Sequence, residues 1–165
     1  MSNTVEQTSL AAPTTYQEWL ECFELMKSGS IVGNEVFDAV RGGIFVGSDL
    51  TKDALQRQIV ETVNALLDKS VKRFIRNLND SIAFNELPDT VLLFKRLKKE
   101  VNISLFFTEL SFLPEGFRHD LEKSVKDQMN GFWNDTVAFL QDQSLEFSNS
   151  DLEDILFLVK RIRLF

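Results

Sequence analysis

The chain has 165 residues, of which 44% are hydrophobic and 26% are charged, with only 7 glycines and 3 prolines. This length suits one ordinary domain, and the composition excludes a disordered, collagen-like or disulfide-rich protein. The formal net charge of −7 argues against a protein whose whole surface engages nucleic acid. The single cysteine, Cys22, cannot form an intramolecular disulfide, which is typical of a protein in a reducing compartment.

The start of the chain shows no targeting pattern. Residues 1–15 contain no lysine, no arginine and no long apolar stretch, so they do not resemble a signal peptide. The most apolar stretch, residues 101–113, is shorter than the roughly 20 residues that a membrane span requires. We therefore expect a soluble, cytoplasmic protein with no membrane partner. Residues 1–14 are expected to form a flexible segment, and residues 15–165 a single helical domain.

Two helices are predicted before residue 50. Thr15 and Glu18 have the spacing of a capping box, and apolar residues then recur at helical spacing until Gly29. Five of the seven glycines lie between residues 29 and 47. Within this glycine-rich part, residues 34–41 are expected to form a short helix capped by Asn34, followed by a loop over residues 42–49.

The middle of the chain predicts one long helix followed by another. From Leu50 to Ile82 apolar residues follow one another by three or four positions without a proline or glycine. Residues 85–88 end this helix, and Pro88 suits the first turn of the next one. Residues 101–107 also alternate as a strand would. Since no second strand signal could pair with them, we predict that they are helical.

Two further helices complete the chain. Pro114 precedes an apolar stripe that runs to Leu140, and Phe132 and Trp133 are expected at the centre of the bundle. Ser150 and Glu153 have capping-box spacing before a last helix that is expected to reach the C-terminus, with three cations in its last turn: Lys160, Arg161 and Arg163. The predicted fold is all-α, an antiparallel helical bundle of about five to six helices with one long central helix.

The basic residues gather in the middle of the chain. Residues 69–100 carry eight basic and four acidic side chains. On a helical wheel the four cations of residues 69–76 share one face opposite the apolar stripe, and those of residues 95–99 group in the same way on the next helix. If the two helices are antiparallel neighbours, both groups form one surface, here called the basic belt: Lys69, Lys72, Arg73, Arg76, Lys95, Arg96, Lys98 and Lys99.

Few residues have the chemistry of catalysis. His119 is the sole histidine and lacks a partner at metal-binding spacing, while Cys22 stands beside carboxylates that disfavour a thiolate. The acidic row of Glu18, Glu21 and Glu24 is expected to be a solvated helix face. The glycine-rich loop at residues 41–49 has no lysine in the phosphate-binding pattern. We therefore expect no catalytic residue, no metal, no cofactor and no enzymatic activity.

Two functional interpretations follow. The 15 phenylalanines mostly fill apolar stripes, and five at loops or chain ends are candidate anchors for a partner: Phe45, Phe84, Phe112, Phe147 and Phe165. The preferred interpretation is a non-enzymatic interaction or assembly module, because a long helix flanked by phenylalanine-rich segments can present an apolar seam for a protein partner or for self-association. The alternative is a nucleic-acid-associated subunit or regulator that uses the basic belt.

Overall fold

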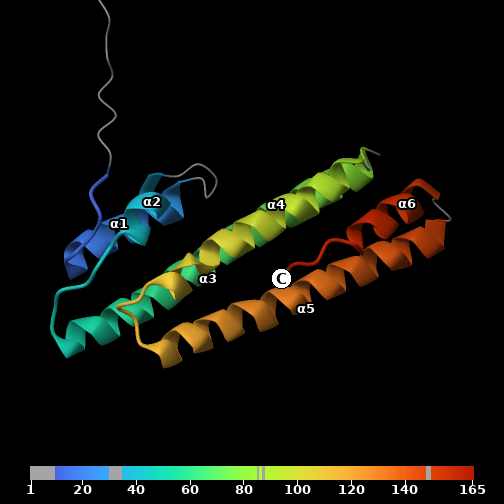
Figure 1. Ribbon diagram of the computed structural model, residues 1–165. Coiled ribbons are helices and arrows are strands. Elements are labelled where there is room, and N and C mark those ends of the chain that lie inside the picture. Colours follow the sequence, from blue (N-terminus) through green and yellow to red (C-terminus); the bar gives the residue numbers. More distant parts are fainter. Residues whose placement is uncertain (1–9, 30–34, 85, 87, 148–149) are drawn as a thin grey trace, which may run out of the picture.

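The computed structural model describes residues 10–29, 35–84, 86, 88–147 and 150–165, and every regular element in these ranges is helical (Figure 1). The predicted all-α class with one long central helix is therefore confirmed. The elements in chain order are α1 (Tyr16–Ser28), α2 (Glu35–Arg41), α3 (Asp49–Ala83), α4 (Pro88–Ser104), the 3₁₀ helix η1 (Leu105–Glu109), α5 (Glu115–Phe147) and α6 (Ser150–Val159).

The long helices lie side by side and alternate in direction along the chain. Helix α4 returns along α3, α5 runs back in the direction of α3, and α6 folds back on the far end of α5 (Figure 1). Helix α1 packs against α3, α2 contacts α1 and η1, and η1 contacts both α4 and α5. Among the described helices, none is both long and apolar enough to cross a bilayer.

Local signals explain where the first helices begin. Thr15 accepts a hydrogen bond from the backbone N–H of Glu18, and the Glu18 carboxylate accepts one from the backbone N–H of Thr15, so the predicted capping box is confirmed. Ser48 caps α3 by accepting from the Thr51 N–H. Asn34, the predicted cap of α2, lies outside the described residues, as does most of the expected flexible segment. At the end of that segment, Pro13 and Thr14 accept backbone hydrogen bonds from the loop at residues 44–46.

The glycine-rich loop is shaped by a buried tryptophan. The Trp19 indole N–H donates to the Ile44 carbonyl at 2.8 Å, and Trp19 has no exposed surface. A Cβ atom on Gly43 would come within 2.6 Å of the Trp19 ring, so only glycine fits there without a shift of the indole. This contact gives the loop a packing role.

Aromatic rings form the centre of the bundle. Phe94 meets Phe74 at 5.0 Å and Trp133 at 4.8 Å between ring centroids, both edge-on, as aromatic pairs prefer. The expectation for Phe132 was wrong in part, because Trp133 is 6% exposed in the core whereas Phe132 is only partly buried, against Phe74. The two neighbours point about 100° apart on the helix, so Trp133 packs against Phe94 of α4 whereas Phe132 faces Phe74 of α3.

Two helix ends differ from the expected ones. Residues 101–107 are helical as predicted, but α4 stops at Ser104 and tightens into η1. The prediction that the last helix reaches the C-terminus is wrong, because α6 ends at Val159 and the chain turns through Lys160 to Ile162. Helix α6 begins at Ser150, and the side chain of the predicted cap lies outside the part of the chain that the structure describes. Of the three C-terminal cations, Arg163 therefore lies beyond the helix and its terminating turn.

Candidate functional site

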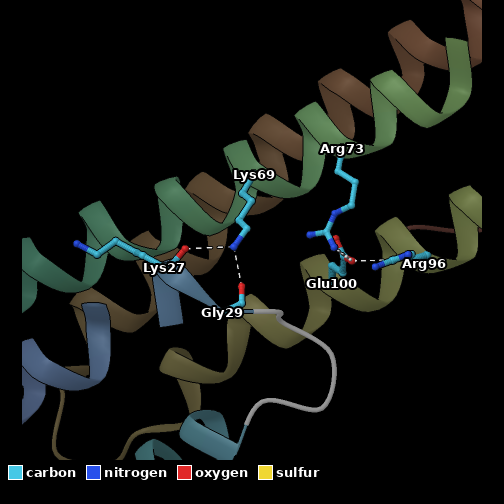
Figure 2. Close-up of polar contacts among 6 residues, drawn as sticks. All are labelled: Lys27, Gly29, Lys69, Arg73, Arg96 and Glu100. Carbon is cyan, nitrogen blue, oxygen red and sulfur yellow. Dashed lines mark hydrogen bonds and ion pairs between the residues drawn. The ribbon is translucent and has the colours of Figure 1, made fainter. Parts of the chain in front are cut away.

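Lys69 of the basic belt closes the end of α1. Its ammonium donates to the backbone carbonyls of Lys27 at 3.2 Å and Gly29 at 2.6 Å (Figure 2). These carbonyls belong to the C-terminal turn of α1, where the helix dipole is negative and carbonyl groups lack helical partners. The charge of Lys69 is therefore engaged within the protein, joining α3 to α1.

Two arginines of the belt meet a buried acid. Glu100 on α4 is only 3% exposed, and its Oε1 lies 3.0 Å from Nε of Arg96 and 3.6 Å from Nη1 of Arg73 on α3 (Figure 2). Ser70 Oγ and Arg73 Nη2 have no hydrogen-bond partner among the described residues and border a cavity of about 10 Å³ beside Glu100, large enough for a single water. Arg73 and Arg96 thus neutralise an internal carboxylate.

The remaining belt residues are more open. Lys72 pairs with Asp68 at 2.7 Å on its own helix, where such exposed pairs contribute little. Arg76, Lys95 and Lys99 are exposed and Lys98 is half-buried, and none of the four has an ion-pair partner in the part of the chain that the structure describes.

The structure thus joins the two halves of the belt but does not present all of it to solvent. The contact between Arg73 and Glu100 brings the basic parts of α3 and α4 to one level, as the antiparallel arrangement predicts. The expectation that the α3 cations share one solvent face was wrong for Lys69 and Arg73, because α1 and Glu100 lie against them. These partners are distant in the sequence, so a helical wheel of α3 alone cannot predict the contacts.

The residues considered for catalysis lie apart. Cys22 is buried in α1, and burial, followed by the charges of Glu21 and Glu18, raises the pKa of its thiol. His119 is exposed near the start of α5. Glu18 serves the capping box, and backbone hydrogen bonds from Thr14 and Thr15 lower its pKa. No group of three potential metal ligands gathers among the described residues.

A surface of a different kind lies where α3 and α5 run side by side. The ring centroids of Phe74 and Phe132 lie 5.8 Å apart. Nearer the start of both helices, Val60 and Phe117 line a shared groove of about 490 Å³ whose other lining residues are polar or charged. Both pairs differ by 57 or 58 positions, and the same offset brings Ile82 level with Phe139. The partly open apolar residues along this line are here called the α3–α5 seam: Val60, Ile75, Ile82, Phe117, Phe132 and Phe139.

The seam remains open to solvent along its length. Val60, Ile75 and Phe139 are 37%, 42% and 45% exposed. Ile75 and Ile82 are seven residues apart on α3, as are Phe132 and Phe139 on α5, so each pair occupies one face of its helix. Ile75, Ile82, Phe132 and Phe139 therefore gather at one end of the seam, and Val60 and Phe117 lie 15 residues away on their helices, at its other end. The sequence signals the apolar spacing of each helix, but only the fold places the two rows together.

Comparison with known proteins identifies no similar protein. No protein-family model matches the chain, and no curated protein and no solved structure gives a significant match.

Proposed function

We propose that this chain is a non-enzymatic helical assembly module that associates with a second copy of itself through the α3–α5 seam. The observation that carries the proposal is the alignment of partly exposed apolar residues on two parallel helices. Because a surface that meets its own copy across a twofold axis uses the same residues on both sides, one apolar row can serve both partners. The lone cysteine supports a reducing, cytoplasmic location.

The size of the seam sets the expected strength of association. From Val60 to Ile82 the seam spans 22 residues of α3, or about 33 Å at the rise of an α-helix. With helix axes roughly 10 Å apart, two helices present a face of roughly 600–700 Å². Stable interfaces bury about 800 Å² on each partner. The seam is therefore slightly smaller than a standard interface, and we expect a reversible dimer rather than an obligate one.

A glycine beside the seam supports close approach by another helix. Gly131 stands directly before Phe132 in the interior of α5, where glycine costs roughly 0.5–1 kcal/mol relative to alanine. A Cβ atom at Gly131 would meet nothing within 4 Å, so packing within the chain does not require this glycine. Close approach of a partner helix backbone to α5 would explain why glycine occupies this position.

Sedimentation velocity over a series of protein concentrations tests the proposal. We expect the sedimentation coefficient to rise with concentration toward that of a dimer. The Ile75→Ser/Phe139→Ser variant should remain monomeric, because it removes apolar contact area from both helices of the seam. The matched control is Leu92→Ser/Phe157→Ser, which changes residues that are 62% and 58% exposed on α4 and α6, and it should associate as the native chain does.

Two results would contradict the proposal. One is a native chain that remains monomeric throughout the micromolar range. The other is equal loss of association in the seam variant and in the Leu92→Ser/Phe157→Ser control, which would indicate non-specific hydrophobic association instead of a defined interface. Circular dichroism and thermal unfolding of both variants separate lost association from lost folding.

The unpaired cations of the basic belt favour a second candidate function, binding to nucleic acid. Arg76, Lys95 and Lys99 are exposed and have no ion-pair partner in the described ranges. Binding to a DNA duplex or a single-stranded RNA should then weaken with salt, with a slope near −0.9 or −0.7 per phosphate contacted, respectively. Arg76→Gln/Lys95→Gln should weaken it for every sequence, whereas Lys52→Gln/Lys123→Gln should not. Equal affinity of both variants would dismiss this candidate.

A further inference from the structure

The chain beyond α6 folds back along α5 and is held there. Its end lies beside the middle of α5 (Figure 1). Leu164 is 3% exposed, and its carbonyl accepts a hydrogen bond from the Asn102 side chain on α4. The Lys126 ammonium lies 5.6 Å from the centre of the Phe165 ring. This segment therefore forms a fixed wall opposite α5.

A groove of about 360 Å³ lies between this wall and α5. Two cations, Lys160 and Arg163, line it together with the side-chain amides of Asn130 and Asn134. The protein has a net charge of −7, yet among the described residues that line the groove none has an acidic side chain. The groove is thus a local concentration of positive charge and hydrogen-bond donors.

The two cations are available to a ligand. Lys160 donates to Oε1 of Gln141 at 3.2 Å, and because this amide is neutral, the charge of Lys160 is not cancelled. Arg163 is exposed and has no ion-pair partner in the part of the chain that the structure describes. Its guanidinium can bind a carboxylate or phosphate through two parallel hydrogen bonds, which are stronger than bonds between neutral groups.

The rest of the groove is apolar. Trp133, Val137 and Ile162 contribute to its walls. Small-molecule sites commonly have volumes of roughly 300–1,000 Å³ and combine apolar walls with a few well-placed polar groups. The volume and the lining of this groove match that description.

We propose that the groove between α5 and the C-terminal segment binds a small organic anion, in which a carboxylate or phosphate is attached to an apolar or aromatic group. Arg163 and Lys160 pair with the anionic group, the two asparagine amides donate further hydrogen bonds to it, and the apolar part lies against Trp133. This site is independent of the α3–α5 seam, because none of the residues that line the groove belongs to the seam.

The test uses two anionic probes, benzoate and phenyl phosphate, and one neutral probe of similar size, benzyl alcohol. Each is titrated into the full chain at constant ionic strength, while the indole N–H resonance of Trp133 is followed by NMR. We expect both anions, or one of them, to shift this resonance saturably and benzyl alcohol to bind at least about tenfold more weakly. A difference between benzoate and phenyl phosphate shows which anionic group the groove prefers.

Matched variants show whether the response is specific. Lys160→Gln/Arg163→Gln should weaken binding of the anions at least about tenfold, because it removes both cations of the groove. Lys52→Gln/Lys123→Gln removes the same charge from exposed positions on α3 and α5 and should leave binding unchanged. The proposal is overturned if no anion gives a saturable shift, if benzyl alcohol binds equally well, or if both variants bind equally.

Discussion

Glu100 and its two arginines provide a sharp test of the structure. The carboxylate is 3% exposed and lies against Arg96 and Arg73. Replacing both arginines, in Arg73→Met/Arg96→Met, leaves a buried carboxylate without a cation while largely preserving the aliphatic packing of the side chains. Removing the partner of a buried charge costs about 3–5 kcal/mol. This is a large share of the roughly 5–15 kcal/mol that stabilises a typical domain.

The loss should be smaller when a single arginine is replaced. Arg96 donates a hydrogen bond to Glu100 at 3.0 Å, and the Arg73 guanidinium lies 3.6 Å from the same oxygen. Because both cations face one carboxylate, the arginine that remains in a single variant still pairs with its charge. Adding Glu100→Leu to the double variant removes the unpaired charge and should recover most of the lost stability. Exchange of a buried ionic cluster for apolar residues is often neutral or stabilising.

Urea unfolding followed by circular dichroism measures these differences. We expect a marked loss of unfolding free energy in Arg73→Met/Arg96→Met and a substantial gain when Glu100→Leu is added. If the double variant changed stability by less than about 0.5 kcal/mol, the usual range for surface substitutions, Glu100 would be in contact with water and the described cluster would be wrong.

Three further predictions concern the core and its contacts. In urea unfolding, Trp133→Ala should lower the unfolding free energy by about 3–5 kcal/mol, because the ring is in the core. Phe132→Ala should lower it clearly less, because its ring is only partly buried. The reverse order would contradict the burial of Trp133. Lys69→Met should lower the unfolding free energy by about 1–3 kcal/mol, because it removes two hydrogen bonds to backbone carbonyls at the end of α1. The control, Lys98→Ala, should change it by no more than about 0.5 kcal/mol. Burial raises the pKa of the Cys22 thiol, so its thiolate forms only at higher pH than in the unfolded chain. Alkylation by iodoacetamide at mildly alkaline pH should therefore be much slower in the native protein than in urea, and equal rates would contradict this burial.

The sequence predicts those features that depend on neighbours along the chain. Thr15 and Glu18 are three residues apart, so the capping box that begins α1 is visible without knowledge of the fold. Pro88 and the uninterrupted apolar spacing from Leu50 likewise predict the border between α3 and α4. The end of α6 at Val159 has no such signal, because neither glycine nor proline follows it.

Contacts between distant residues account for what the sequence does not predict. Arg73 looks like a surface cation on a helical wheel, and only the packing of α4 brings Glu100 against it. Phe132 and Trp133 both belong to a broad apolar stripe, and the packing of α4 against Trp133 decides which of them is more deeply buried. The two rows of the α3–α5 seam are separated by 57 or 58 residues, so their alignment follows from the fold alone.

The most direct test of the proposed assembly is to map the contact surface in solution. Backbone amide NMR spectra recorded at increasing protein concentration report which residues change environment on association. We expect progressive shifts or broadening along the α3–α5 seam, at Val60, Ile75 and Phe139 and at neighbouring Gly131. Spectra independent of concentration, or changes confined to other exposed apolar residues such as Leu92 and Phe157, would contradict association through the seam.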